Sequence, residues 1–256
     1  MSDGLPGIDP AALRILLCDA DDCLFASERL AFVASTEVTN AFLAEVLGSQ
    51  QRFEPSALHA WAVGRNFRAT ANALAQEHGA EVDPAELDRW VAEERRQVSA
   101  MLAAELQPDP AVREPVEALG LRWALAAVSS SALARLDVCF EASGLADLFP
   151  PEARYSAEDS LPVPTSKPDP AVYRHAGEQL GVSGAEALAV EDSLAGVRAA
   201  VAAGFPVVGN LLFVPDGARD AHAAALLEAG AAAVVGSWAE LADRLGVAAR
   251  PPAASA

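Results

Sequence analysis

Two aspartates separated by one residue, Asp19 and Asp21, directly follow the short apolar run Ile15–Cys18. An uncharged run bounded by polar residues predicts a strand buried in a parallel sheet. Such a strand would deliver both carboxylates to the carboxyl edge of the sheet, where open α/β folds bind their ligands. One carboxylate could attack a phosphorus atom there while the other moves a proton. Taken alone, the pair is equally compatible with capping of the next helix.

Three more polar clusters lie at or just after the ends of expected strands. They are Ser129-Ser130-Ser131, Lys167 within Thr165-Ser166-Lys167-Pro168, and Glu191-Asp192-Ser193. Each has a plain structural interpretation, since serine and aspartate cap helices and a lysine can be surface charge. Their order along the chain and their common position at strand ends favour a functional site.

The elements that would position these clusters fall into two kinds. Between residues 27 and 48 apolar residues recur every four positions, and helices are expected over 27–48, 67–78 and 84–106, with no strand between 28 and 107. After Pro108 the pattern alternates, with strands expected over 121–128, 187–190, 207–209 and 232–235 and helices over 131–143 and 193–203. Alternation of this kind indicates parallel pairing with right-handed crossovers. The sequence therefore predicts an α/β core with an all-helical insert after its first strand.

At these residues the chain resembles the haloacid dehalogenase-like superfamily, in its capped phosphatase and β-phosphoglucomutase-like branch. The matching stretches cover nearly the whole chain: Asp19-Ala20-Asp21, Ser129, Lys167-Pro168-Asp169-Pro170 with Tyr173, and Glu191 through Gly204. The resemblance implies a Rossmann-like parallel sheet with helices on both faces, formed by residues 1–27 and 108–256. It also implies that residues 28–107 form an inserted helical cap domain.

The resemblance assigns a chemical role to each matched position. Asp19 would be the nucleophile that forms an aspartyl-phosphate, and Asp21 would be the acid and base. Since residues two apart on a strand project to the same side, both carboxylates are expected to face one phosphorus. Ser129, Ser130 and neighbouring backbone amides would bind the phosphoryl oxygens. Lys167 would neutralise nucleophile and phosphate.

Crowded carboxylates at this site require a cation. Asp19, Asp21, Glu191 and Asp192 would raise one another's pKa values, and a divalent cation relieves that repulsion. An oxygen-rich site with few protein ligands suits Mg²⁺. The resemblance assigns the metal to Asp19, the backbone carbonyl of Asp21 and Asp192, with Glu191 in support.

Several positions depart from the family pattern or distinguish its branches. Asp22 stands where a glycine is usual, which places a side chain and a negative charge near the phosphate, and Ser166 replaces the glycine before the lysine. The dehalogenase branch lacks the second aspartate of the first motif, so Asp21 disfavours dehalogenation. The sugar phosphomutases carry a cap histidine where this chain has Ala31, which favours hydrolysis.

The insert offers one candidate for substrate selection. Gly64-Arg65-Asn66 resembles the substrate-facing loop of the cap, and Arg65 and Arg68 are expected on one helix face. They could hold a second anionic group or sugar hydroxyls. A solvated basic face explains them equally well.

These features predict a magnesium-dependent phosphatase that acts on a small phosphorylated metabolite, of the sugar phosphate or phosphoglycolate class. A sugar phosphomutase is the nearest alternative, and a non-catalytic phosphate-binding relative is a third reading suggested by Asp22. A receiver-type signalling module also uses clustered aspartates, a serine and a lysine. Receivers are much smaller, lack a helical insert, and have no acidic pair such as Glu191-Asp192.

Bulk composition excludes other partner classes. A net charge of −18 disfavours nucleic acid and anionic membranes as partners. The three cysteines, Cys18, Cys23 and Cys139, form no paired motif, so no disulfide framework is expected. No apolar stretch reaches membrane length, and no signal peptide is recognised. We therefore expect a cytoplasmic protein, either monomer or homodimer.

Overall fold

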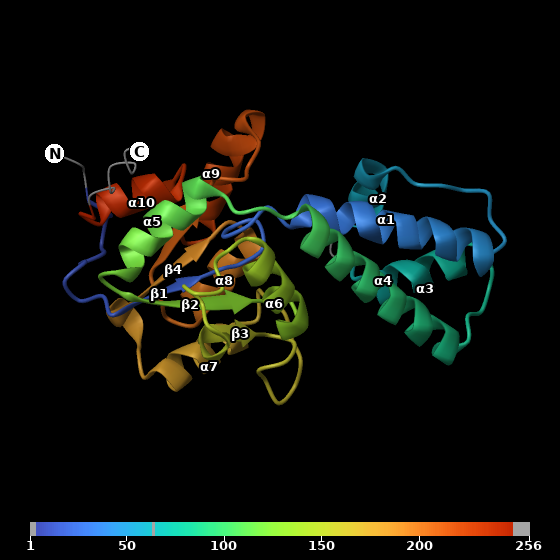
Figure 1. The fold of residues 1–256 in the computed structure, drawn as a ribbon, viewed down its shortest axis with the longest axis horizontal. Helices are drawn as coiled ribbons and strands as arrows, with labels where there is room; N and C mark the ends of the chain where they lie inside the picture. The colour runs from blue at the N-terminus through green and yellow to red at the C-terminus, as the bar shows by residue number, and fades with distance from the viewer. Residues whose placement is uncertain (1–3, 63–64, 248–256) are drawn as a thin grey trace, which may run out of the picture. The chain divides into compact units, whose positions relative to one another are not determined.

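The computed structural model describes residues 4–62 and 65–247. The chain divides into two compact units, which Figure 1 shows as the sheet-containing part and the helical part. Unit 1 comprises Met1–Ala26 and Gln107–Ala256, and unit 2 comprises Ser27–Leu106. Each unit is described by itself below.

Unit 1 is built on one six-stranded sheet in which every neighbouring pair is parallel. The strands in chain order are β1 (Ile15–Cys18), β2 (Ala124–Ser129), β3 (Arg154–Ser156), β4 (Ala187–Glu191), β5 (Val207–Asn210) and β6 (Ala233–Val235). Their order across the sheet is β3-β2-β1-β4-β5-β6, so β1 lies in the interior between β2 and β4. The strand order reverses direction at β1, and this switch point is where such sheets bind ligands.

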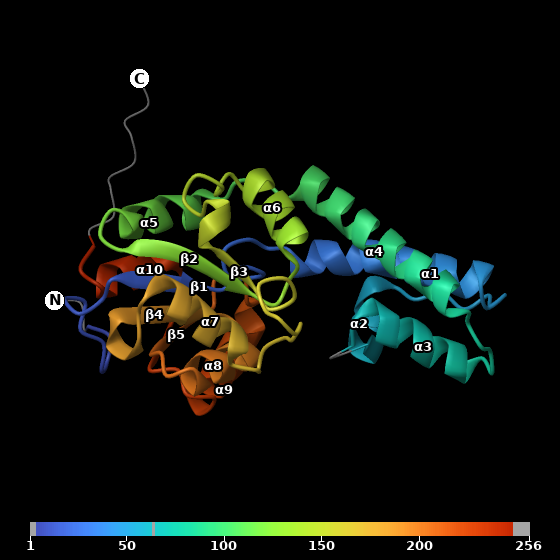
Figure 2. The ribbon, with the colours of Figure 1, turned by 90° about the horizontal axis from the view of Figure 1, so that it is seen from below.

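Helices cover both faces of this sheet. Figure 2 shows α5 and α10 on one face and α7 and α8 on the other. The helices of unit 1 are α5 (Pro110–Gly120), α6 (Leu133–Ala142), α7 (Ala171–Leu180), α8 (Leu194–Ala202), α9 (Arg219–Glu228) and α10 (Trp238–Arg244), with short 3₁₀ turns at Pro151–Ala153, Gly184–Glu186 and Asp216–Ala218. The predicted fold class, a parallel α/β sheet covered on both faces, is confirmed.

The two-sided cover explains why β1 reads as an unbroken apolar run. Ile15 and Leu17 belong to a core cluster with Val172 of α7 and Val197 of α8. The alternate residues, Leu16 and Cys18, are also fully buried. Because successive side chains point to opposite faces of a sheet, both faces of the strand must be apolar.

Unit 2 contains α1 (Glu28–Glu45), α2 (Pro55–Ala62), α3 (Phe67–Glu77) and α4 (Pro84–Glu105). Its core gathers Phe42, Phe67 and Trp90, whose rings meet edge to face. The side chain of Asp83 accepts hydrogen bonds from the backbone of Ala85 and Glu86, and these bonds cap α4. The described part of unit 2 contains helices and no strand.

The structure differs from the sequence-based expectations at several element ends. β2 begins at Ala124, three residues later than expected, because Leu121 follows α5 as its C-cap and is 82% exposed. β3 has three residues and was not predicted, since so short a strand carries no periodicity. Five helices were not predicted either, namely α2, α5, α7, α9 and α10. Within the described residues, no helix is long and apolar enough to cross a membrane.

Candidate active site

The backbone register brings two acidic residues side by side at the carboxyl end of the sheet. Cys18 of β1 is paired with Val190 of β4, and the N–H of Asp19 donates to the carbonyl of Val190 over 2.9 Å. Asp19 therefore follows the last residue of its strand, and Glu191 is the last residue of the neighbouring strand. Both are buried, with Asp19 7% exposed and Glu191 fully enclosed.

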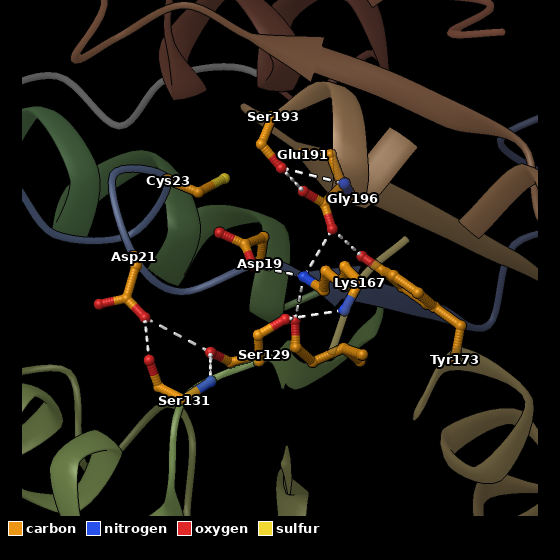
Figure 3. Close-up of polar contacts among 12 residues, drawn as sticks. Asp19, Asp21, Cys23, Ser129, Ser131, Lys167, Tyr173, Glu191, Ser193 and Gly196 are labelled. Atoms are coloured by element: carbon orange, nitrogen blue, oxygen red, sulfur yellow. Dashed lines mark hydrogen bonds and ion pairs between the residues drawn. The ribbon is translucent and has the colours of Figure 1, made fainter. Parts of the chain in front are cut away.

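The ammonium group of Lys167 joins these two carboxylates, as Figure 3 shows. Its Nζ lies 2.5 Å from Asp19 Oδ1 and 2.6 Å from Glu191 Oε1, and it also donates to the carbonyl of Val128 over 2.7 Å. The side chain is 5% exposed although it carries a charge. A buried cation is tolerated because three oxygens receive its three protons. The structure thus brings together three residues that lie far apart in the sequence.

Two residues besides Lys167 fix the side chain of Glu191. The hydroxyl of Tyr173 on α7 donates to Glu191 Oε1 over 2.5 Å. Gly196, in the first turn of α8, lies so close that a Cβ there would fall 1.8 Å from Glu191 Oε2. Only glycine leaves room for this carboxylate, which explains the glycine in the Glu191–Gly204 stretch in terms of packing.

Burial and mutual repulsion set the pKa values of the acidic residues. Burial raises the pKa of Asp19 to about 8, although Lys167 acts in the opposite direction. Burial, followed by the charges of Asp19, Glu191 and Asp22, raises the pKa of Asp192 well above its usual range. Burial alone would lower the pKa of Lys167, but the two carboxylates outweigh burial and raise it. The lysine is therefore charged at neutral pH.

Three of these carboxylates could share a metal ion. Asp19, Glu191 and Asp192 each offer an oxygen, and the three oxygens lie within 4.8 Å of one another. An all-carboxylate donor set suits hard cations such as Mg²⁺, Ca²⁺ or Mn²⁺. The excess of negative charge around one lysine, together with the raised pKa values, fits a site that gains a cation when active.

Asp21 takes a different direction from the one expected. β1 ends at Cys18, and Asp21 makes only an isolated bridge to Phe25, so strand alternation does not set its orientation. Its carboxylate turns toward Ser131, which precedes α6, as Figure 3 shows. There Ser131 Oγ donates to Oδ2 over 2.7 Å, and Arg135 Nη2 donates to Oδ1 over 2.7 Å.

The predicted phosphate-binding serines lie next to this group. Ser129 Oγ donates to Asp21 Oδ2 over a longer distance of 3.4 Å and accepts from the N–H of Ser131 over 3.0 Å. Ser130 Oγ accepts from the N–H of Lys167 over 3.1 Å. The three serines of this cluster therefore connect the lysine side of the site with the Asp21 side.

Asp22 occupies a backbone conformation that explains the usual glycine at this position. Its φ is 52°, the one left-handed non-glycine conformation in the part of the chain that the structure describes. Aspartate tolerates this region better than most residues, so the turn can form without glycine. The side chain nevertheless adds a negative charge that acts on Asp192.

Arg65 and Arg68 do not share a helix face. The helix begins at Phe67 with Asn66 as its N-cap, so Arg65 precedes it, and Gly64 lies outside the described residues. The guanidinium of Arg65 lies over the ring of Trp61, 4.8 Å from its centroid, while Arg68 forms an ion pair with Asp88. The expectation failed because the asparagine cap starts a new helix between the two arginines.

A family model matches most of the chain. The model described as haloacid dehalogenase-like hydrolase matches residues 13–204, which include every motif residue described above. The chain belongs to the haloacid dehalogenase-like hydrolase family. The resemblance inferred from the motifs is thereby confirmed, and so is the expectation that the protein is a hydrolase.

Solved structures of this hydrolase family have the same fold. A candidate β-phosphoglucomutase from Thermotoga maritima is 26% identical, with 92% of this chain and 100% of that chain covered and a TM-score of 0.68. A HAD family hydrolase from Deinococcus radiodurans, solved with bound phosphate and sodium, is 25% identical, with 95% and 100% covered and a TM-score of 0.64. A predicted phosphoglycolate phosphatase from Haemophilus somnus is 20% identical, with 91% and 97% covered and a TM-score of 0.69. A search of curated proteins found no match.

Three further residues of this hydrolase contact the site and were not singled out from the sequence. Arg135 binds Asp21, the ring of His222 contacts the backbone carbonyl of Asp192 at 2.6 Å, and Trp238 Nε1 donates to the carbonyl of Cys23 over 2.8 Å. Arg135 lies in the first turn of α6, and no local pattern in the sequence connects it with Asp21. His222 and Trp238 lie beyond the family match and carry no local signal.

Proposed function

We propose that the protein is a Mg²⁺-dependent phosphatase that hydrolyses a small organic phosphomonoester, of the sugar phosphate or phosphoglycolate class. One observation carries this proposal. Lys167 forms an ion pair with the carboxylate of Asp19 at the switch point of the sheet. Asp19 also belongs to a cluster with Glu191 and Asp192 whose oxygens suit a cation. Membership of a hydrolase family supports the same conclusion.

In the first step, an oxygen of Asp19 attacks the phosphorus of the substrate. The bond between phosphorus and the ester oxygen breaks, and that oxygen takes a proton from Asp21 as it leaves. Asp21 must then present a carboxyl group to the leaving oxygen. The product of this step is an aspartyl-phosphate on Asp19 and a free alcohol.

In the second step, a water molecule attacks the phosphorus of the aspartyl-phosphate. Asp21, now a carboxylate, accepts a proton from that water, and the bond from phosphorus to the Asp19 oxygen breaks. Inorganic phosphate leaves, and both aspartates return to their starting forms. Thus one carboxylate acts as nucleophile and the other as acid and then base.

Positive charge at the site must balance the negative charge of the phosphoryl group. Lys167 supplies one fixed charge beside Asp19, and the Ser129 hydroxyl and nearby backbone N–H groups would donate to phosphoryl oxygens. Asp19, Asp192 and the backbone carbonyl of Asp21 would hold Mg²⁺, which when bound supplies further positive charge to the phosphoryl group. Glu191 supports the site through Lys167 and Tyr173, which already occupy Oε1.

Substrate specificity would depend on Arg65 of unit 2, which would contact the organic part of the substrate. Its guanidinium is exposed and rests on Trp61, so it is available to an anionic group or to hydroxyls.

The expected cytoplasmic location, and the oligomeric state of monomer or homodimer, stay predictions.

A sugar phosphomutase is a second candidate, favoured by the similarity to the Thermotoga maritima protein. Ala31 favours hydrolysis over this alternative, because the mutases carry a histidine at the aligned position. The two activities differ in product, since a mutase interconverts phosphate isomers without net release of phosphate.

The test is an assay of phosphate release from sugar phosphates, phosphoglycolate and an aryl phosphate, with isomer formation followed in parallel by ³¹P NMR. Release should require Mg²⁺, stop with chelator, and be absent in Asp19→Asn. Isomerisation without release would establish the mutase instead. If neither reaction occurs, Asp22→Gly restores the usual residue, and continued inactivity of that variant would contradict an enzymatic role.

A further inference from the structure

The carboxylate of Asp21 is held by donors from one side of the site. Oδ1 accepts from Arg135, and Oδ2 accepts from Ser131 and, more weakly, from Ser129. The side chains are partly enclosed, with Asp21 16% and Arg135 27% exposed. Figure 3 shows the carboxylate directed at Ser131, whereas Asp19 and Lys167 lie together on the other side. Both oxygens of the proposed acid are therefore engaged away from the nucleophile.

This orientation does not serve the step assigned to Asp21. To protonate a leaving oxygen or accept a proton from water, the carboxyl group must lie within hydrogen-bond reach of a group bound at Asp19. A carboxylate that accepts from a guanidinium with one oxygen and from hydroxyls with the other has to break those contacts first. The observed arrangement is thus a resting orientation of Asp21.

Ser129 connects this resting orientation to phosphate binding. A serine hydroxyl has one proton to donate, and in the free protein Ser129 directs it at Asp21 across 3.4 Å. If Ser129 donates to a phosphoryl oxygen instead, Asp21 loses that contact. The contacts that Ser131 and Arg135 make with the carboxylate do not depend on that proton.

We propose that Arg135 is a positioning residue that holds Asp21 in a resting orientation until phosphate binds, and so sets the fraction of enzyme with Asp21 ready to transfer a proton. The inference rests on the proposed phosphatase function. A group that contacts only the resting orientation opposes the reactive one, so its removal must shift the population toward the reactive orientation.

The proposal is tested with Arg135→Met, which removes the donors and keeps an unbranched side chain that favours helix. On an alkyl phosphate, kcat/KM should rise roughly two- to fivefold, the range that a partly exposed ion pair can shift. On an aryl phosphate with a good leaving group, kcat/KM should stay unchanged, because that leaving oxygen needs no proton. Arg135→Lys, which keeps a cation, should return the alkyl value toward wild type.

Arg113→Met is the matched control, because Arg113 on α5 also pairs with an aspartate, Asp147, outside the site. It should leave both kcat/KM values unchanged. A parallel fall with both substrates in Arg135→Met would show that Arg135 binds substrate or supports the fold, and would overturn the proposal. If Arg135→Met does not fold, Ser131→Ala removes the other donor and should give the same selective rise.

A structural measurement separates this proposal from the proposed function. Crystal structures of the wild-type protein, free and with Mg²⁺ and orthovanadate, report the orientation of Asp21 without turnover. Asp21 should contact Arg135 in the free protein and leave it in the complex, even if no tested ester is hydrolysed. An Asp21–Arg135 ion pair that persists in the vanadate complex would overturn the proposal while leaving phosphatase activity intact.

Discussion

The ion pairs of Lys167 at the candidate site of unit 1 are buried, whereas those of unit 2 are exposed. In unit 1, Lys167 and Glu191 are buried and joined to Asp19 and Tyr173 by hydrogen bonds of 2.5–2.6 Å. In unit 2, ion pairs such as Arg68–Asp88 and Arg96–Glu93 lie on exposed surfaces. Exposed pairs contribute little to stability, whereas breaking a buried one leaves an uncompensated charge. Unit 1 also has exposed ion pairs, such as Arg113–Asp147, so the difference between the units lies in the buried network at the candidate site.

The largest effect is expected where the buried network loses its cation. Lys167→Met leaves the carboxylates of Asp19 and Glu191 without their shared partner, and it removes a positive charge from the phosphoryl group. We expect kcat to fall by about 10²- to 10³-fold. Phosphate release and thermal melting measure the two consequences. Activity within a fewfold of wild type would contradict the role of the lysine.

Gly196→Ala tests whether the packing around Glu191 matters as much as its charge. The new Cβ would meet Glu191 Oε2 at 1.8 Å, so the carboxylate and the lysine bound to it must shift. A displacement of about 1 Å at a catalytic group can cost about 10²-fold in rate. Gly217→Ala is the matched control, because nothing lies within 4 Å of its added Cβ. Equal effects in the two variants would mean that the close approach is unimportant.

The pH dependence of cation binding tests the charge balance of unit 1. With the pKa of Asp19 raised to about 8, a proton must leave before the cation can bind at neutral pH. The affinity for Mg²⁺ should therefore rise with pH, by up to about tenfold per unit, and level off above about 8. Calorimetry between pH 6 and 9 in buffers of different ionisation enthalpy would count the released protons. A flat profile would exclude proton competition at this site.

Substitutions of Asp22 should have a smaller effect, and they separate the role of its backbone conformation from that of its negative charge. Asp22→Asn keeps a residue that tolerates φ of 52° and removes the negative charge near Asp192. Repulsion of the phosphate should decrease and attraction of the cation should weaken, each by roughly two- to fivefold. Kinetic measurement of KM and of the Mg²⁺ requirement checks both. Asp22→Gly should behave alike; a difference between the variants would assign the effect to the backbone.

The smallest effect is expected in unit 2. Arg65→Ala should raise KM by about two- to threefold with kcat nearly unchanged, because an exposed arginine contributes binding and not chemistry. Arg68→Ala, whose guanidinium is already paired with Asp88, is the matched control and should change neither. A loss of kcat in Arg65→Ala would show that unit 2 takes part in the reaction.

The sequence predicts the central strands of unit 1 for a physical reason. β1 and the first four residues of β4 are uncharged because both faces of the sheet are covered, and this composition is visible without a structure. The three-residue β3 and the exact start of β2 depend on pairing with neighbours, which no local pattern shows. The Lys167–Asp19 contact could be expected only from the family resemblance of the motifs, since Lys167 lies well beyond the end of β3, a strand that was not predicted. The orientation of Asp21 could not, because it depends on Arg135 and Ser131 from another part of the chain.

The central claim is that Asp19 carries the phosphoryl group during turnover. The most direct measurement is an acid quench during hydrolysis, followed by borohydride reduction and mass spectrometry of the peptide that contains residues 15–29. Reduction of an aspartyl-phosphate gives homoserine. We predict that homoserine forms at position 19 of the wild-type protein, that it does not form at position 21, and that the Asp19→Asn variant contains none. Phosphate release without any modification at Asp19, or modification at another residue, would contradict the mechanism.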